Sequence, residues 1–202
     1  MANFVAILVA YSIGSIVWAV VLGRVLFRVD LRGGDNPGAS GAVRTFGPRF
    51  GVAVGLLDLL KGVAAVAIAR RLGVSETVAA LAAGAAVAGH NWPIWFGFHG
   101  GGGLATSAGV LASFGLRETL LGIGVALLFA LIYKHPRLYG KLPMSALPFG
   151  SLFGLPLMIW LFQRAGNGGG TLTASLCVLI VGIRALGMHA ETKRRRSHPG
   201  IA

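Results

Sequence analysis

The 202-residue chain has few charged residues and a single cysteine. Charged side chains make up 12% of the sequence and apolar ones 55%, a balance that excludes an ordinary soluble domain and is typical of polytopic membrane proteins. Cys177 is the only cysteine, so an intramolecular disulfide is excluded. It lies in an apolar run, and a thiolate metal site is not expected. No basic region precedes the first apolar run, which we therefore expect to remain as a spanning segment instead of leaving as a signal peptide.

Acidic residues are also scarce, with six against eighteen basic ones and a formal net charge of +12. In a soluble protein this charge would indicate nucleic-acid binding, but here the basic residues stand at the ends of apolar stretches instead of forming one face. The pattern therefore indicates membrane topology. We expect membrane lipids and phosphorylated substrates as partners, and no nucleic acid.

Seven apolar stretches predict an all-α, polytopic membrane bundle with about seven transmembrane helices, since a bilayer core requires about 20 residues of helix. The stretches cover residues 4–26, 52–69, 78–98, 104–114, 119–133, 144–162 and 172–188. A five-span arrangement, in which short stretches enter the protein without crossing, is the alternative. Residues 1–202 are expected to form a single integral membrane domain.

The basic residues predict the orientation of the chain. Arginines 24–49, the cluster at 134–141 and the tail at 193–196 fall on one side of the membrane under either count of spans. Cytoplasmic loops carry the excess of Lys and Arg, so the N-terminus is expected outside and the C-terminus in the cytoplasm.

Residues 89–106, GHNWPIWFGFHGGGGLAT, are the expected functional segment. The glycines at 100–103 let backbone N–H groups converge on an anion, and a helix beginning near Leu104 would add its positive N-terminus. His90 could act as a general base, as a hydrogen-bond donor to phosphate or as a structural side chain. No carboxylate or second histidine stands nearby at ligand spacing, so no metal site is expected.

The first loop, residues 30–51, contains turn-forming glycines together with Asn36 and Arg44, and Arg44 offers two parallel donors to a phosphate. An ordinary glycine-rich connector is the alternative interpretation. Asp58 and Lys61 stand three residues apart in an apolar stretch and hence on one helix face, where they could form a structural ion pair or orient the site. His189, near the end of the last stretch, could face the same cleft.

In five motifs and their order, the chain resembles the PlsY-type membrane acyltransferases, which transfer an acyl group from acyl-phosphate to glycerol 3-phosphate. They are YSIGS at 11–15, DLR at 30–32, NPGAS at 36–40, DLLKG at 58–62 and the segment at 89–106. The resemblance covers about the first half of the chain. It implies a seven-helix bundle in the bacterial inner membrane, with a cytoplasmic active site that makes 1-acylglycerol 3-phosphate and phosphate for phospholipid biosynthesis. No cofactor is implied.

The motifs and the resemblance together imply a set of site residues. The catalytic residues are expected to be Arg44, His90 and His189; the substrate-binding residues Asn36, Gly38, Ser40, His99, Gly100, Gly101, Gly102, Gly103 and Thr106; and the supporting residues Asp58 and Lys61. The chain departs from the family pattern where lysines give way to His99 and Gly102, a serine to Gly34 and an asparagine to Thr192. A catalytically inactive paralogue that binds phosphorylated lipid precursors is therefore an alternative hypothesis. The charge pair at Asp58 and Lys61 motivates another, a small transporter.

Overall fold

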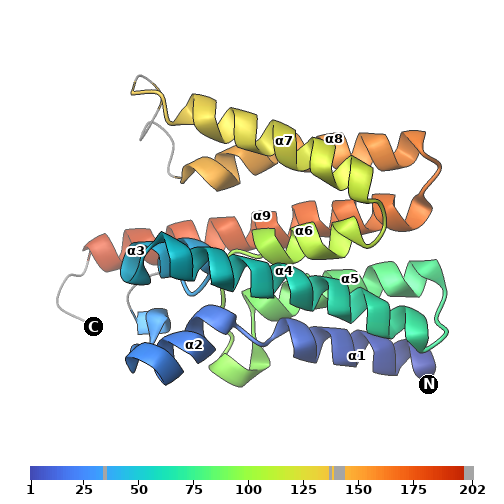
Figure 1. Ribbon diagram of the computed structural model, residues 1–202, viewed down its shortest axis with the longest axis horizontal. Helices are drawn as coiled ribbons and strands as arrows, with labels where there is room; N and C mark the ends of the chain where they lie inside the picture. The colour runs from blue at the N-terminus through green and yellow to red at the C-terminus, as the bar shows by residue number, and fades with distance from the viewer. Residues whose placement is uncertain (34–35, 137, 139–143, 198–202) are drawn as a thin grey trace.

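The computed structural model describes residues 1–33, 36–136, 138 and 144–197, with only the backbone for Gly33 and residues 191–197. These residues form a bundle of helices without a strand (Figure 1). The helices are α1 (Ala2–Gly14), α2 (Trp18–Phe27), α3 (Ala39–Phe46), α4 (Pro48–Arg71), α5 (Glu76–Asn91), α6 (Leu104–Ala112), α7 (Leu116–Tyr133), α8 (Ala146–Arg164) and α9 (Gly168–Ser197), with short 3-10 turns η1 (Leu31–Gly33) and η2 (Ile94–Phe96).

Five segments within the described part of the chain are long and apolar enough to cross a membrane: residues 2–27, which comprise α1 and α2, then α4, α7, α8 and residues 168–190 of α9. The expected all-helical membrane architecture is confirmed. Helix α5 has 16 residues and α6 has nine. At about 1.5 Å per residue, α5 is roughly 24 Å long and shorter than a hydrocarbon core of about 30 Å. Seven crossings and the sidedness of the termini stay predictions.

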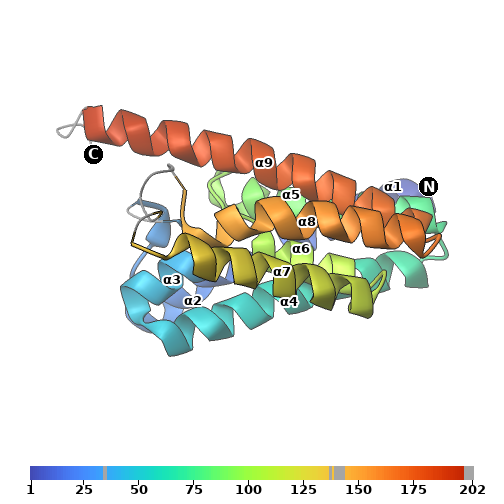
Figure 2. The ribbon, with the colours of Figure 1, turned by 90° about the horizontal axis from the view of Figure 1, so that it is seen from above.

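Helices α5 and α6 form a hairpin inside the bundle. Helix α5 begins at the end of the bundle that carries the N-terminus and reaches only its middle, and α6 runs back to the same end (Figures 1 and 2). The segment that joins them contains η2 and the glycines at 100–103. Irregular backbone at such depth is tolerated where protein surrounds it, and both α1 and α9 contact this segment.

The first apolar stretch is two helices because the chain breaks between Ser15 and Val17. The Ser15 hydroxyl donates to the carbonyl of Tyr11, a contact that bends helices, and Val17 has an extended backbone with φ −91° and ψ 96°. The break leaves the carbonyl of Ile16 outside the helical ladder. The ammonium of Lys61 on α4 donates to this carbonyl at 2.6 Å and so satisfies it.

Small residues let α5 approach its neighbours closely, as is usual where lipid removes the hydrophobic drive between helices. Five alanines of α5 are fully buried: Ala79, Ala80, Ala82, Ala83 and Ala86. A methyl group on Gly14 of α1 would collide with the carbonyl of Ala86, and one on Gly89 with the carbonyl of Tyr11. Helices α1 and α5 therefore pack with their backbones almost in contact.

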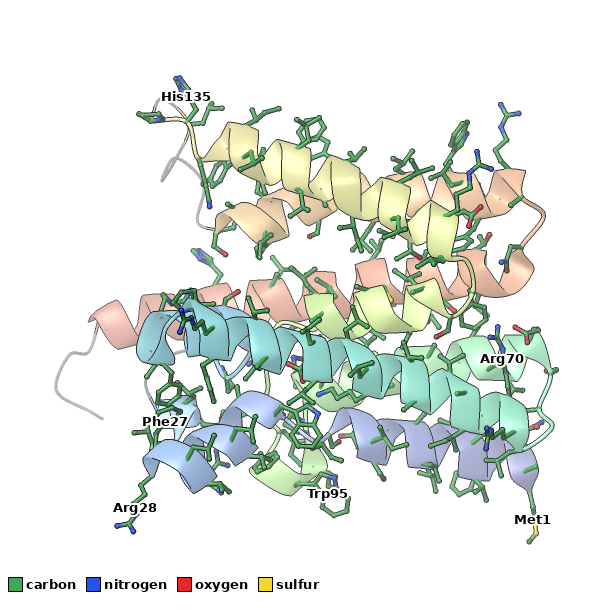
Figure 3. The ribbon with its side chains drawn as sticks, in the orientation of Figure 1. Met1, Phe27, Arg28, Arg70, Trp95 and His135 are labelled. Carbon is green, nitrogen blue, oxygen red and sulfur yellow. The ribbon has the colours of Figure 1, made fainter. Side chains whose placement is uncertain are left out.

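The turn η2 is attached to the end of α1. The Tyr11 hydroxyl donates to the carbonyl of Trp92 at 2.6 Å, and the indole N–H of Trp95 donates to the carbonyl of Ser12 at 3.1 Å. Trp95 itself projects outward at the edge of the bundle (Figure 3). These bonds fix where the segment after α5 turns back toward α6.

Candidate active site

The glycine segment folds back against the end of α5. The N–H of Gly101 donates to the carbonyl of His90 at 3.1 Å. A side chain on Gly100 would collide with that same carbonyl, and a methyl on Gly103, which has φ +83°, would lie 2.5 Å from Oδ1 of Asn91. Gly102 is different, because the nearest atom to a methyl there would be Nδ2 of Asn36 at 3.9 Å. This geometry requires glycine at 100, 101 and 103 and leaves 102 open toward the first loop.

Two helices begin beside these glycines. Gly38, the N-cap of α3, lies against Gly101, since a methyl on Gly101 would be 3.3 Å from the α-carbon of Gly38. Gly103 is the N-cap of α6. Neither helix has a side-chain hydrogen bond at its N-cap. First-turn amides without intrahelical partners favour an anion. We call the two helix starts and the glycine segment the cradle.

A buried ionic cluster lies behind the cradle. Nζ of Lys61 is 2.8 Å from Oδ1 of Asp58 and 2.8 Å from Nδ1 of His90. The side chains of Asp58, Lys61 and His90 are each no more than 4% exposed. The pairing of Asp58 with Lys61 on one helix face is as expected, but the sequence does not predict that His90 joins them. A buried charge requires such partners, because an unpaired one is strongly destabilising.

Arg184 of α9 reaches the cradle from the opposite side. Its guanidinium is buried and donates from Nη2 to the carbonyl of Gly100 at 2.8 Å and from Nε to that of Gly101 at 3.2 Å. A trans peptide points its carbonyl and its N–H in opposite directions. Arg184 therefore turns the N–H of Gly102 away from α9. Sequence analysis missed this residue, although a lone arginine inside an apolar stretch is itself a signal of a functional site.

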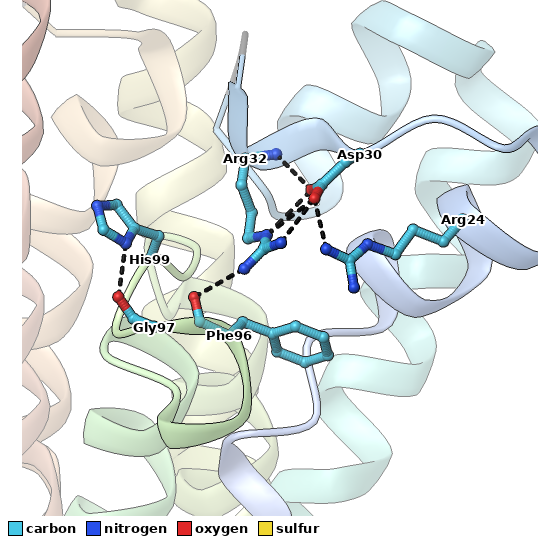
Figure 4. A network of polar contacts seen from close by, with 6 residues as sticks. All are labelled: Arg24, Asp30, Arg32, Phe96, Gly97 and His99. Carbon is cyan, nitrogen blue, oxygen red and sulfur yellow. Dashed lines mark hydrogen bonds and ion pairs between the residues drawn. The ribbon is translucent and has the colours of Figure 1, made fainter.

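A surface ion cluster connects the first loop to η2 (Figure 4). Asp30 accepts hydrogen bonds from Arg32 and, at 2.6 Å, from Arg24. The bonds from Arg32 are the main cause of a pKa of Asp30 well below its usual range, and Arg24 lowers that pKa further. Arg32 also donates to the carbonyl of Phe96 at 3.0 Å, and both guanidinium groups lie over the Phe96 ring. These contacts thus hold the first loop against η2 at the protein surface.

The remaining predicted residues lie around this centre. Thr106 is fully buried in the first turn of α6, Ser40 is half-buried on α3, and His99 is exposed with Nδ1 2.6 Å from the carbonyl of Gly97. Arg44 lies at an exposed position of α3. His189 is exposed on α9, five residues beyond Arg184 and therefore turned by about 140° around the helix from it.

The structure thus brings His90, Asp58 and Lys61 together with the glycines at 38 and 100–103, while Arg44 and His189 are exposed. Gly34 lies outside the described residues, as does the side chain of Thr192. Within the described part of the chain, no three His, Cys, Asp or Glu side chains are grouped so as to hold a metal ion.

These features define an integral membrane protein with a buried polar cluster beside a glycine segment. Comparison with known proteins specifies its family. The family described as "Glycerol-3-phosphate acyltransferase" matches residues 4–196. Glycerol-3-phosphate acyltransferase 2 from Deinococcus radiodurans is 35% identical over 191 residues, covering 94% of this chain and 95% of the relative. Glycerol-3-phosphate acyltransferase from Neisseria gonorrhoeae is 36% identical over 187 residues, covering 89% and 90%.

A solved structure has the same fold. The crystal structure of PlsY (YgiH), an integral membrane glycerol 3-phosphate acyltransferase, in its glycerol 3-phosphate form superposes with a TM-score of 0.78 at 27% identity, over 98% of this chain and 94% of that one. The chain belongs to the glycerol-3-phosphate acyltransferase family. The resemblance carried by the motifs is confirmed and extends beyond the first half of the chain.

Proposed function

We propose that this protein transfers an acyl group from acyl-phosphate to glycerol 3-phosphate, which yields 1-acylglycerol 3-phosphate and inorganic phosphate for phospholipid biosynthesis. The observation that carries the proposal is the cradle at Gly38 and Gly100–Gly103, with buried cations next to it. The chain matches relatives named glycerol-3-phosphate acyltransferase over nearly their whole length. Residues 1–202 act as one membrane domain.

The reaction needs positioning more than activation, because an acyl-phosphate is already a reactive donor. The hydroxyl oxygen at C1 of glycerol 3-phosphate bonds to the acyl carbon, the bond from that carbon to the phosphate oxygen breaks, and phosphate leaves with the electron pair. The cradle amides would hold a phosphate group through this step, and Arg184 keeps the carbonyls of Gly100 and Gly101 turned away from it. The hydroxyl proton leaves to a substrate phosphate oxygen, to His90 or to His189.

The test is an acyl-transfer assay in which detergent-purified protein is given palmitoyl-phosphate and glycerol 3-phosphate. Released phosphate is measured, and the lipid product is identified by mass spectrometry. Product from palmitoyl-phosphate but not from palmitoyl-coenzyme A supports both the activity and the donor. Arg44→Ala is assayed beside the parent, since a phosphate contact from Arg44 predicts a loss in that variant. Binding of both substrates without turnover would refute the proposal.

An inactive paralogue is the second candidate, favoured by His99 and Gly102 at positions where the family carries lysines. Gly102→Lys separates the two candidates, because a methyl at position 102 has no atom closer than Nδ2 of Asn36 at 3.9 Å and a longer side chain has room to leave the loop. Turnover in the parent identifies an enzyme. Turnover only in Gly102→Lys identifies a disabled one.

We place the protein in the bacterial inner membrane with the cradle on the cytoplasmic side, on the basis of the arginines at 24–49. Because the native Cys177 is buried, a cysteine at an exposed position would be the reactive one. Exposed Arg28 and Ala165 lie toward opposite ends of the spanning helices. A membrane-impermeant maleimide applied to intact spheroplasts should label Ala165→Cys but not Arg28→Cys, and the reverse result would invert the orientation.

A further inference from the structure

We propose that Lys61 holds His90 in the Nε2–H tautomer and that His90 therefore donates a hydrogen bond to the bound anion instead of accepting the substrate proton. The inference deepens the proposed acyl transfer and rests on it for the identity of the anion. The inference gives a role in substrate binding to the buried cluster of Asp58, Lys61 and His90, which would otherwise be interpreted as structural.

The first step is the surroundings of Lys61. An ammonium has three N–H donors and no acceptor. Three acceptors surround Nζ: the carbonyl of Ile16 at 2.6 Å, Oδ1 of Asp58 at 2.8 Å and Nδ1 of His90 at 2.8 Å. The charged form of Lys61 is favoured because a neutral amine would leave the buried Asp58 carboxylate uncompensated. The ammonium thus forms hydrogen bonds with Ile16 and His90 and an ion pair with Asp58.

The second step follows for His90. A proton on Nδ1 would face an N–H of Lys61, so Nδ1 must be the acceptor of that bond. Asp58 does not compete for a proton on Nδ1, since its Oδ1 is 3.6 Å away, which is too long for a hydrogen bond. The neutral imidazole then carries its proton on Nε2, because the partner of one ring nitrogen decides which nitrogen is protonated.

The third step is the direction of Nε2. A methyl group added to Gly101 would collide with Nε2 of His90 and would lie 3.3 Å from the α-carbon of Gly38. Nε2 therefore faces the side of the cradle where the first loop meets the glycine segment. Its N–H adds a neutral donor to the backbone amides there. A nitrogen that carries this proton has no lone pair for the hydroxyl proton, so the base is a substrate phosphate oxygen or another residue.

Nuclear magnetic resonance tests the tautomer directly in the full-length protein. The protein is labelled with ¹⁵N-histidine and reconstituted in lipid nanodiscs, and the His90 signals are assigned by their loss in His90→Gln. We expect a protonated Nε2 and an unprotonated, hydrogen-bonded Nδ1 from about pH 6 to about pH 8. Addition of inorganic phosphate should shift the Nε2–H proton signal. A proton on Nδ1, or no shift at saturating phosphate, would overturn the inference.

Kinetics test the donor role. A glutamine side chain places an amide N–H near the position of Nε2 but cannot act as a base. We expect His90→Gln to keep kcat/KM within about tenfold of the parent and His90→Ala to lose about 100-fold, the scale of one lost donor in an active site. Equal losses in both folded variants would indicate a base and contradict the inference. A parent without any turnover would refute the proposed function, while the resonance experiment would still decide the tautomer.

Lys61→Met tests the positioning role of Lys61. The charged side chains around His90 are Asp58 and Lys61 on α4 and Arg184 on α9. Without Lys61, both tautomers of His90 should be populated, and turnover should become dependent on pH near neutrality. A purely structural role of Lys61 would instead lower turnover equally at every pH and leave the tautomer unchanged, which would count against the inference.

Discussion

Replacement of Gly101 by alanine is the smallest change that tests the cradle. The added methyl group would collide with Nε2 of His90 and would lie 3.3 Å from the α-carbon of Gly38. Gly101 has no positive φ, so the effect arises from lack of space and not from backbone strain. The matched control is Gly102→Ala in the same segment, where a methyl group would meet only Nδ2 of Asn36, at 3.9 Å.

The expected size of the effect follows from what would have to move. His90 cannot swing aside without breaking its bond to Lys61, and a hydrogen bond to a charged group contributes about 1.5 to 3 kcal/mol. The glycine segment would shift instead, and a misplacement of about 1 Å near the reacting groups costs about 100-fold in rate. We expect kcat/KM for glycerol 3-phosphate to fall about 100-fold in Gly101→Ala, which is about 2.7 kcal/mol. Gly102→Ala should change it by less than about threefold.

The assay is the initial rate of 1-acylglycerol 3-phosphate formation over a range of glycerol 3-phosphate concentrations. Size-exclusion profiles and thermal unfolding establish that each variant is folded. A folded Gly101→Ala with parental kcat/KM would show that the anion is not bound at Gly101. Equal losses in both variants would show a general intolerance of side chains in the segment and would refute the specific contact with His90.

Three further predictions concern other contacts. Arg184→Gln should lower kcat/KM by about 10- to 100-fold. Arg184→Lys should recover only part of this loss, because an ammonium lacks the planar guanidinium that donates to two carbonyls. A full recovery in Arg184→Lys would contradict the importance of these two bonds. Gly62→Ala should lower the unfolding temperature in detergent, since its methyl group would lie 2.6 Å from a backbone carbonyl of α6, whereas Gly55→Ala, with 3.5 Å to its nearest neighbour, should not. Asp30 has a folded-state pKa below its usual 3.8, so its contribution to stability is complete above about pH 4 and is lost as the pH falls further. Thermal unfolding from neutral to acid pH should therefore show a smaller decline in Asp30→Asn than in the parent, and identical declines would mean that the bonds to Arg32 do not stabilise the fold.

The long helices could be predicted from the sequence because lipid demands continuous apolar runs. The stretch at 52–69 lies within α4 (Pro48–Arg71), and that at 119–133 within α7 (Leu116–Tyr133). The break at Ile16 could not be predicted, because the freed carbonyl is satisfied by Lys61, 45 residues further along the chain. The position at which α5 ends within the bundle also depends on contacts with other helices. The hydrophobicity of a stretch does not predict such contacts.

The cradle could be located from the sequence because its glycines are neighbours in the chain and the chemistry that they favour is local. The ion pair of Asp58 and Lys61 could also be predicted, since a spacing of three residues places both on one helix face. The contact of His90 with Lys61 spans 29 residues and that of Arg184 with the glycine segment more than 80. No spacing rule joins residues so far apart, so a lone arginine in the apolar stretch at 172–188 indicates a site without indicating which one.

The position of Arg184 bears on whether a loop without lysine can serve as an anion site. A guanidinium carries a permanent charge, and this one is buried against the carbonyls of Gly100 and Gly101, where water screens its field little. The positive potential at the cradle therefore does not depend on residues 99 and 102 alone. If Arg184 supplies it, Gly102→Lys adds a second charge to a working site and raises kcat/KM by less than about tenfold. If it does not, that variant should gain far more, and the absence of lysine from the loop would then mark a disabled enzyme.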